Sequence, residues 1–250
     1  MLPLEVEEHA VDPHPLLRKL ETQGLDLTAD EQLALLGMPM QIETIRADQD
    51  IVREGDRPTR SCLILEGYAA TYKVTPTGKR QIVAFHISGD IPDLQSAQLE
   101  VLDTSLGTLT PARVAFVRHE VINEVCERHY RLARAFWRQT LIDAAIFREW
   151  VVNVGRREAL NALAHVMCEF VLRMWVMGLA EGEECELPMT QAELGDALGI
   201  STVHVNRTLQ ELRAAGLIRL QGARLTVLDW ERLKEVGEFD PTYLHLRQAA

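Results

Sequence analysis

The sequence predicts an α+β fold with three parts: an N-terminal β-roll or jelly-roll sensor domain, a long dimerisation helix and a C-terminal winged helix-turn-helix. Three observations predict it. Short β-type runs alternate with turn residues from about 41 to 118, and helical periodicity dominates from about 119 to 178. After residue 189, two short helical patterns joined by a glycine turn precede a hairpin pattern.

The gross properties are those of a globular protein with room for a core. The chain has 250 residues, enough for one or two domains, and 47% of them are hydrophobic. No apolar run approaches the length of a membrane span. The acidic start, Met1–Glu8, lacks the basic-then-apolar layout of a signal peptide. We therefore expect a cytoplasmic protein that does not enter a membrane.

The four cysteines, Cys62, Cys126, Cys168 and Cys185, form no C-x-x-C pair, and no His/Cys spacing suits zinc. We expect free, mostly buried thiols in a reducing compartment. A redox-sensing thiol is the alternative. The sequence predicts no cofactor and no metal site.

The first third of the chain begins with helical segments between residues 16 and 37, where Thr28 is the expected N-cap and Gly37 the expected end. Short β-type runs with turn signals between them follow, and this spacing predicts a sandwich or barrel such as a jelly roll. The expected strands are Ile42–Ile45, Cys62–Leu65, Tyr68–Val74, Gln81–His86, Ser105–Leu109 and Arg113–Val117.

The long helix expected over 119–154 carries two apolar stripes. One has the alternating three- and four-residue spacing of a coiled-coil seam: Tyr130, Ala133, Trp137, Thr140, Ala144, Phe147, Val151 and Val154. The other contains Leu132, Phe136, Ile142, Ile146 and Trp150. Two stripes imply two partners, so we expect one face on the β-domain and the seam, from Tyr130 to Val151, on the same helix of a second subunit. The alternative is a helix buried within one subunit.

A glycine near the end of this helix predicts a hinge. Gly155, within Asn153–Arg156, is unfavourable in the middle of a helix. We expect the helix to be interrupted there. A second long helix should then run from about Arg156 to Met177.

The segment from Thr190 to Leu212 has the local chemistry of two helices joined by a tight turn. Thr190 with Glu193 predicts a capping box. Gly195 permits close helix approach, and Gly199 tolerates the positive φ of a turn. Ser201 is the expected cap of the second helix. The apolar spacing predicts that its inward face consists of Val205, Leu209 and Leu212.

The outward residues at the start of the second helix occupy the positions that meet base edges in a DNA-reading helix. Arg207 matches guanine O6 and N7, and Asn206 suits adenine or a phosphate. Thr202 and Val203 suit a thymine methyl group, and His204 a phosphate or base. The predicted DNA contacts are Thr190, Gln191, Ser201, Thr202, Val203, His204, Asn206 and Arg207, with Arg224 on the hairpin wing. The alternative is that these are solvated surface residues.

The net charge of −11 is unfavourable for a nucleic-acid binder, but its distribution matters more than its sum. Residues 190–228 contain four arginines against three acidic residues. The excess of acidic residues therefore lies mainly outside the helix-turn-helix. We expect modest, salt-sensitive phosphate contact there.

The layout resembles the bacterial Crp/Fnr transcription regulators over roughly residues 15 to 236. The most specific part is Ser201–Gln210, and the Gly55-Asp56 and Gly89-Asp90 turns and Gly67 fit the family's β-roll. The resemblance implies a homodimer that binds double-stranded DNA at a palindromic operator, with RNA polymerase as a partner. It also implies that the protein is not an enzyme.

The sequence departs from the family's ligand-binding patterns. Members that bind cyclic AMP carry a Gly-Glu pair and an arginine after the second Gly-Asp turn. Here residues 89–100 contain Asp93 and Glu100, and no arginine or lysine occurs between Arg80 and Arg113. A cyclic phosphate would therefore lack its charge-assisted partner. We expect no tight cyclic-nucleotide binding.

Other departures concern metal groups and base reading. Fnr-type members hold an iron–sulfur cluster on N-terminal cysteines, but no cysteine precedes Cys62. Some relatives bind haem through a β-roll histidine, but His86 stands alone and is expected to be structural. Val203 and Asn206 replace the family's Glu and Ser, whereas Arg207 is retained. The effector remains unassigned.

The expected division is an effector-like β-roll with leading helices at 1–118, the long dimerisation helix at 119–154, the winged helix-turn-helix at 155–236 and a tail at 237–250. Two rival functions stay open. A cupin-like enzyme or metal-binding β-barrel would need clustered histidines, and the barrel offers only His86. A regulator that needs no ligand is the second rival.

Overall fold

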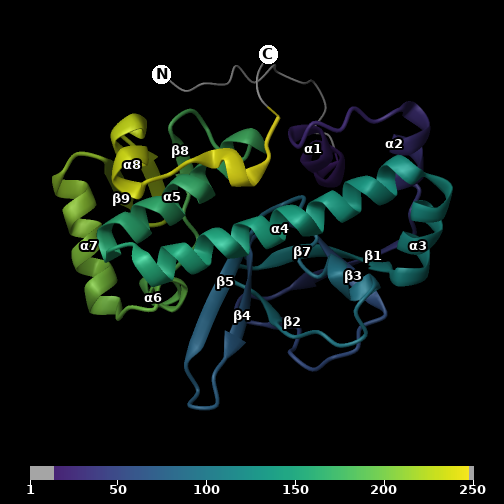
Figure 1. Ribbon diagram of the computed structural model, residues 1–250, viewed down its shortest axis with the longest axis horizontal. Helices are drawn as coiled ribbons and strands as arrows, with labels where there is room; N and C mark the ends of the chain where they lie inside the picture. The colour runs from purple at the N-terminus through teal and green to yellow at the C-terminus, as the bar shows by residue number, and fades with distance from the viewer. Residues whose placement is uncertain (1–13, 248–250) are drawn as a thin grey trace.

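The computed structural model describes residues 14–247, so the acidic start and residues 248–250 lie outside the described part of the chain. Figure 1 shows the β-rich part lying beneath a long helix, α4, that crosses most of the molecule. The C-terminal helices gather at one end of α4 and the N-terminal helices at the other. This order confirms the predicted α+β architecture.

The N-terminal helices are α1 (Pro15–Thr22) and α2 (Ala29–Leu36). Thr28 caps α2 in a reciprocal capping box with Glu31: the Glu31 amide donates to the Thr28 hydroxyl at 3.3 Å, and the Thr28 amide donates to the Glu31 carboxylate at 2.8 Å. Gly37 follows as the C-cap. Both predicted ends of α2 are confirmed.

The β-roll consists of two antiparallel sheets. One has the order β1-β7-β3, formed by Met40–Ile45, Ala112–Arg118 and Arg60–Glu66. The other has the order β2-β6-β4-β5, formed by Asp50–Val52, Ser105–Thr108, Ala69–Val74 and Arg80–His86. They enclose a small core that includes Cys62, Ile64, Leu106, Val114 and Phe116. The predicted strands are all present; β2 was not predicted because three residues carry no readable alternation.

Helices cover the outer face of the β1-β7-β3 sheet. Leu63, Leu65, Ala115 and Val117 on that face pack against α1, α3 (His119–Arg128) and α4 (Tyr130–Arg156). The single helix predicted from residue 119 is therefore two helices. They break at His129, whose φ of −126° and ψ of 88° lie outside the helical region.

The predicted interruption at Gly155 is wrong. Helix α4 continues through Gly155 to Arg156, and the chain turns only at Arg157, whose ψ is 142°. Gly155 is exposed, and one glycine costs only about 1 kcal/mol in a helix. Packing on either side outweighs that cost: Asn153, buried beside it, donates from Nδ2 to the carbonyl of Ala162 at 3.2 Å.

Helix α5 (Ala159–Val176) is the central helix of the C-terminal part. It is long and apolar enough to cross a membrane by length and composition, contrary to the expectation that no such run exists. In the folded chain, 72% of that window is buried. Met167, Met174 and Met177 are buried in the same core, as filling side chains rather than as a ligand set.

The winged helix-turn-helix surrounds α5. It comprises α6 (Gln191–Leu198), α7 (Thr202–Ala214), the sheet β8-β10-β9 (Glu184–Glu186, Arg224–Val227 and Ile218–Gln221) and α8 (Trp230–Gly237). Strand β8 was not predicted. The expected C-terminal tail is partly ordered: a 3-10 turn, η2 (Pro241–Leu244), packs against α4.

The winged domain rests directly on the β-roll. The β4–β5 hairpin projects from the roll, and its β5 strand contacts α6 (Figure 1). Arg80 Nε bonds to Asp196 at 2.7 Å, and Gln81 donates from Nε2 to the Ala197 carbonyl at 2.9 Å. The two domains therefore share an interface in addition to α4.

Candidate nucleic-acid interface and the junction behind it

The turn between α6 and α7 is set by local chemistry. The Glu193 amide donates to the Thr190 hydroxyl at 3.2 Å, and the Thr190 amide donates to Glu193 Oε2 at 2.7 Å, so the predicted capping box is confirmed. Gly199 has a φ of +68°, as the tight turn requires. A Cβ on Gly195 would lie 2.7 Å from the Ile200 carbonyl oxygen, so only glycine allows this approach.

Helix α7 presents one buried and one exposed face. Ser201 caps it by accepting from the His204 amide at 3.3 Å, and Val205, Leu209 and Leu212 are buried, as predicted. On the outward side, Val203 is 79% exposed, and Thr202, Asn206 and Arg207 are also exposed. His204 is half-buried. The face predicted to meet DNA is therefore open to solvent.

Arg207 is held by its own helix. Its Nη2 lies 3.0 Å from His204 Nε2, and its Nε lies 3.5 Å from Glu211. The spacings of three and four residues place all three side chains on one face, a signal that the sequence already contained. The structure therefore makes His204 a support for Arg207. The Arg207 side chain is still 69% exposed, so it remains available to a ligand.

The other predicted contact residues divide into two groups. Asn206 Nδ2 donates to Gln191 Oε1 at 3.3 Å, which brings the starts of α6 and α7 together. Thr190, Gln191 and Ser201 are exposed beside them. Arg224 lies separately on the wing, where it bonds to Glu184 at 3.2 Å. Glu184, which the sequence reasoning missed, offsets part of the charge that Arg224 offers to a phosphate.

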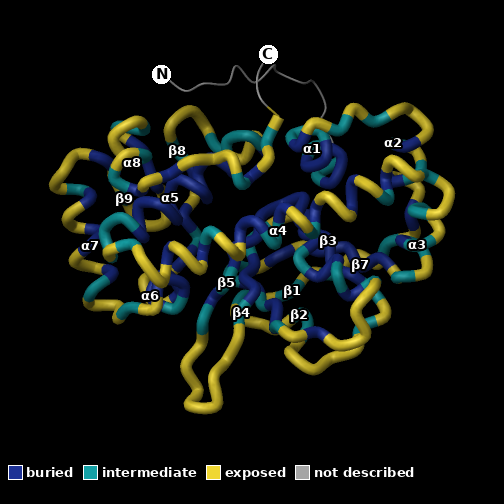
Figure 2. Tube along the Cα trace, viewed as in Figure 1, coloured by how far each residue is buried: buried dark blue, intermediate teal, exposed yellow. Residues whose placement is uncertain are grey.

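Helix α4 leaves its predicted seam uncovered. Tyr130 is 73% exposed, Trp137 67% and Val151 69%, and Phe147 is also exposed. Ala133, Thr140 and Ala144 between them are half-buried. The other stripe, Leu132, Phe136, Ile142, Ile146 and Trp150, is buried, so the two-faced character of this helix is confirmed (Figure 2). The alternative of a seam buried within one chain is wrong.

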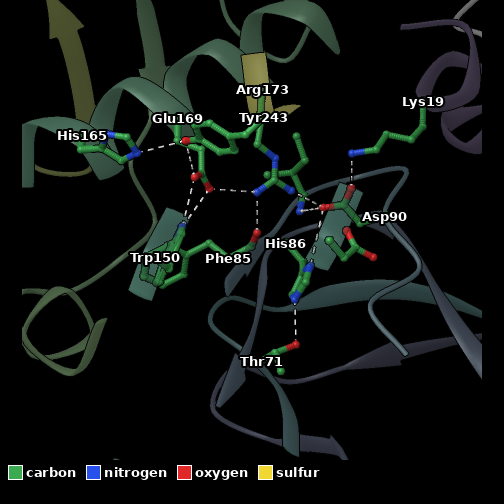
Figure 3. A network of polar contacts seen from close by, with 12 residues as sticks. Lys19, Thr71, Phe85, His86, Asp90, Trp150, His165, Glu169, Arg173 and Tyr243 are labelled. Atoms are coloured by element: carbon green, nitrogen blue, oxygen red, sulfur yellow. Dashed lines mark hydrogen bonds and ion pairs between the residues drawn. The ribbon is translucent and has the colours of Figure 1, made fainter. Parts of the chain in front are cut away.

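Behind the interface, a buried carboxylate joins three parts of the molecule. Asp90, in the Gly89-Asp90 turn, accepts from Lys19 Nζ of α1 at 2.6 Å and from Arg173 Nη2 of α5 at 2.6 Å (Figure 3). Burial alone would raise the pKa of Asp90, but Lys19 and Arg173 outweigh that effect and hold it well below its usual range. Asp90 is therefore ionised between two cations.

Arg173 extends the contact network into the C-terminal domain. Its Nη1 donates to the Phe85 carbonyl at 2.8 Å and lies 3.7 Å from Glu169. Glu169 in turn accepts from Trp150 Nε1 of α4 at 3.1 Å and from the Tyr243 hydroxyl of η2 at 2.7 Å (Figure 3). We call the set Lys19, Asp90, Glu169 and Arg173 the junction network. It ties α1, the β-roll and α5 to one another, and Glu169 extends it to α4 and η2.

His86 lies beside this network and fulfils the structural role expected of it. It is buried, and its Nε2 lies 2.8 Å from the Thr71 hydroxyl while Nδ1 lies 3.8 Å from Asp90 (Figure 3). Among residues 14–247, no group of three His, Cys, Asp or Glu side chains is placed to hold a metal ion.

The comparisons with known proteins match both domains. The cyclic nucleotide-binding domain family matches residues 42–129, and the Crp-like helix-turn-helix domain family matches residues 161–236. The chain belongs to the Crp/Fnr family. It is a DNA-binding transcription regulator of this type, and the family is not a class of enzymes, which removes the cupin-like alternative.

The sequences of several relatives align with most of the length of this Crp/Fnr regulator. It is 25% identical over 209 residues to the transcriptional activator protein FnrL of Cereibacter sphaeroides, covering 82% of this chain and 84% of that protein. It is 22% identical over 215 residues to the transcriptional activator protein anr of Pseudomonas aeruginosa, covering 86% of each. The structure of FixK2 from Bradyrhizobium japonicum superposes with a TM-score of 0.73 at 23% identity, covering 80% of this chain and 98% of that one.

The segment after the second Gly-Asp turn of this Crp/Fnr regulator contains a buried acid. The Cys62 amide donates to Asp93 Oδ1 at 2.8 Å, while Asp93 Oδ2 is buried with no hydrogen-bond partner among the described residues. Burial raises the pKa of Asp93 to about 7. Next to it, the hydroxyls of Ser61 and Ser96 lie 3.3 Å apart, and Ser96 lies 3.0 Å from His119 Nε2. This buried cluster of polar groups contains a carboxyl group and no arginine or lysine of the segment 89–100.

The cysteines of the regulator are free thiols. Cys62, Cys168 and Cys185 are buried and Cys126 is half-buried. Burial raises the pKa of each thiol, so the thiolate that reacts with oxidants is disfavoured at neutral pH. The expectation of free and mostly buried thiols is confirmed.

Replacing Asp93 by Asn should change how stability depends on pH. The folded pKa of about 7 lies above the unfolded value of about 3.9, so between these values the folded state keeps a proton that the unfolded state has lost. The stabilising contribution of Asp93 is therefore complete below about pH 4 and is lost as pH rises to about 7. Relative to wild type, Asp93→Asn should gain roughly 2–4 kcal/mol in unfolding free energy between pH 4 and pH 8.

Urea unfolding at a series of pH values measures this difference. Asp103→Asn is the matched control, because Asp103 is an exposed aspartate of the same β-roll, and it should follow the wild-type profile. Parallel pH profiles for Asp93→Asn and wild type would contradict the assignment.

Proposed function

We propose that this protein is a homodimer that binds an inverted-repeat operator without cyclic AMP. The exposed seam of α4 carries this proposal. A soluble chain rarely leaves several large apolar side chains on one helix face in water unless a partner covers them. The seam has coiled-coil spacing, so a second copy of α4 is the occupant that matches it.

In this dimer each α7 enters a major groove. The proposal is supported by the open outward face of α7, on which Thr202, Val203, Asn206 and Arg207 are exposed near the capped N-terminus of the helix. Two such helices related by a two-fold axis reach successive grooves about 34–36 Å apart, which requires an inverted repeat. RNA polymerase is the further partner, and the cytoplasm is the compartment where these partners occur.

The proposed reading roles follow the side-chain chemistry. Arg207, steadied by His204, binds guanine O6 and N7, and Asn206 binds adenine or a phosphate. Thr202 and Val203 contact thymine methyl groups. Thr190, Gln191 and Ser201 lie at the helix starts and, with Arg224 on the wing, contact the phosphate backbone. These are proposals for each residue, supported by exposure and spacing.

Independence from cyclic AMP is supported by charge. A cyclic phosphate needs a cationic or amide donor set. The segment 89–100 has no basic residue, and its buried acid, Asp93, accepts a hydrogen bond from the Cys62 amide. The units that we propose are the β-roll with its leading helices to residue 118, the long helix to 154, the winged domain to 236 and the segment beyond it.

Replacing Arg207 by Ala should weaken operator binding and relax base choice at one position of each half-site. A bidentate arginine–guanine contact contributes about 1–3 kcal/mol, so the affinity per half-site should fall about 5- to 150-fold. The measurement is fluorescence anisotropy, at one fixed salt concentration, on the duplex that wild-type protein selects from random DNA. Arg219→Ala, an exposed arginine on β9, is the matched control. Unchanged affinity and base preference for Arg207→Ala would refute the assigned contact.

The same assay tests independence from cyclic AMP. Tighter binding of wild-type protein to the duplex on addition of cyclic AMP would refute that independence.

Charging the seam should separate the subunits. Trp137→Glu combined with Val151→Glu places two carboxylates in the proposed interface, where burial without a partner costs several kcal/mol. Light scattering should give a mass near 28.2 kDa for the variant and twice that for wild type. Val152→Glu makes the same change on an exposed neighbour outside the seam and should stay dimeric. A wild-type mass of one chain, or a dimeric double variant, would contradict the proposed interface.

A further inference from the structure

We propose that two acidic side chains, Glu211 on α7 and Glu184 on β8, are specificity-determining residues that suppress binding to DNA of arbitrary sequence. Each is paired with one of the two arginines in the predicted DNA contact set, Arg207 and Arg224. This role rests on the proposed function, because it concerns the same DNA-facing surface. It adds to that function a physical reason for the surface to prefer an operator over other DNA.

The reading helix α7 presents an arginine whose charge is already balanced. Arg207 Nε lies 3.5 Å from a carboxylate oxygen of Glu211, at the four-residue spacing that brings side chains together on a helix. The two side chains are 69% and 50% exposed, and an ion pair this open to water contributes little to stability. The fold therefore does not depend on this pair, and its effect is on the charge that α7 offers to DNA.

The pairing leaves hydrogen-bond donors of Arg207 available. A guanidinium has five N–H donors and no acceptor. Arg207 donates from Nη2 to His204 Nε2 at 3.0 Å and Glu211 lies beside Nε, so the two N–H groups of Nη1 and the second one of Nη2 remain. These donors can still form the bidentate contact with guanine O6 and N7. The Glu211 carboxylate therefore cancels the net charge of Arg207 without removing its capacity to read a base.

Phosphates and bases are recognised by different properties of an arginine. Attraction to the phosphate backbone is an effect of charge, which is independent of sequence and is driven by the release of counterions. Recognition of a guanine edge depends instead on the direction of hydrogen bonds. An arginine neutralised by its neighbour therefore loses more of the first than of the second. The ratio of operator affinity to non-specific affinity rises as a result.

The wing repeats this arrangement with a carboxylate that has two partners. Glu184 accepts from Arg224 Nη1 at 3.2 Å through Oε2 and from the Thr226 hydroxyl at 3.2 Å through Oε1. The antiparallel ladder of β8 and β10 places Thr226 opposite Glu184 and Arg224 opposite Glu186. Because both of its oxygens are bonded, the carboxylate of Glu184 is held beside Arg224.

The charge of the whole reading region is balanced in the same way. Residues 190–228 contain four arginines and three acidic residues. Strand β8 adds Glu184 and Glu186 beside the wing, and β5 adds Arg80, which bonds to Asp196 at 2.7 Å. Five arginines then stand against five acidic residues. DNA of arbitrary sequence therefore meets little net positive charge in this region, and directional hydrogen bonds carry the preference for an operator.

Fluorescence anisotropy on the full chain, with two duplexes of equal length and a series of salt concentrations, tests this role. One duplex is the sequence that wild-type protein selects from random DNA, and the other is a scrambled version of it. Glu211→Gln should bind the scrambled duplex about three- to tenfold more tightly, with a slope of log affinity against log salt that is steeper by about 0.9, because one more phosphate is neutralised. Its affinity for the selected duplex should rise by a smaller factor, so the ratio of the two affinities should fall.

A cycle of double variants measures whether the arginines mediate the effect. In the Arg207→Ala background, Glu211→Gln should change affinity for the scrambled duplex by a much smaller factor. Glu184→Gln should act in the same direction through Arg224, and its effect should shrink likewise in the Arg224→Ala background. Glu127→Gln is the matched control for lost negative charge, because Glu127 is exposed on α3, at the end of α4 opposite α7 (Figure 1). It should bind both duplexes as wild type does.

The proposed role is overturned if Glu211→Gln and Glu184→Gln leave the affinity ratio and the salt slope at their wild-type values. It is also overturned if Glu211→Gln keeps its full effect in the Arg207→Ala background. A wild-type protein that binds every duplex equally would instead refute the proposed operator binding. The titrations with the scrambled duplex do not require an operator, so the two failures are distinguishable.

Discussion

The carboxylate of Asp90 is the point on which the arrangement of the domains depends. It is buried, and taking an ion out of water costs several kcal/mol unless partners compensate. Lys19 and Arg173 compensate at 2.6 Å each, from helices on opposite sides of the turn. Any displacement of α5 from the β-roll would remove Arg173 from this charge and leave Lys19 to compensate its burial alone. The electrostatic requirement therefore fixes the winged domain on the roll.

Other contacts between the two domains depend on this position of the winged domain on the β-roll. Because Arg173 also bonds to the Phe85 carbonyl, α5 is aligned with β5, and β5 in turn supports α6 through Gln81 and Ala197. The outward face of α7 is thereby set relative to the seam of α4. In the proposed dimer, two α7 helices must lie at one spacing, and this fixed relation between α7 and the seam would provide it.

The sequence predicts those features of the fold that depend on residues close together in the chain, and it fails for features that depend on packing between distant elements. The capping boxes at Thr28 and Thr190 and the turn at Gly199 are determined within four residues, and the structure has each of them. The break at His129 and the continuity through Gly155 depend on packing by distant elements, so local propensity predicted them wrongly. Strands β2 and β8 have three residues each, too few for an alternation pattern.

The site divides in the same way. The exposed face of α7 and the seam of α4 follow from helical periodicity and could be read directly. The support of Arg207 by His204 had a sequence signal, a spacing of three residues, that was not used. The junction network had none: Lys19, Asp90 and Arg173 are separated by 71 and 83 residues, and only the folded chain brings them together.

The most direct test of this account is the dependence of binding on the distance between operator half-sites. In the proposed dimer, each α7 has a fixed place relative to the seam of α4. Wild-type protein should therefore bind tightly at one spacing, and inserting about 5 base pairs, half a helical turn, should reduce affinity to the non-specific level. Equal affinity for duplexes of different half-site spacing, measured at one salt concentration, would contradict it.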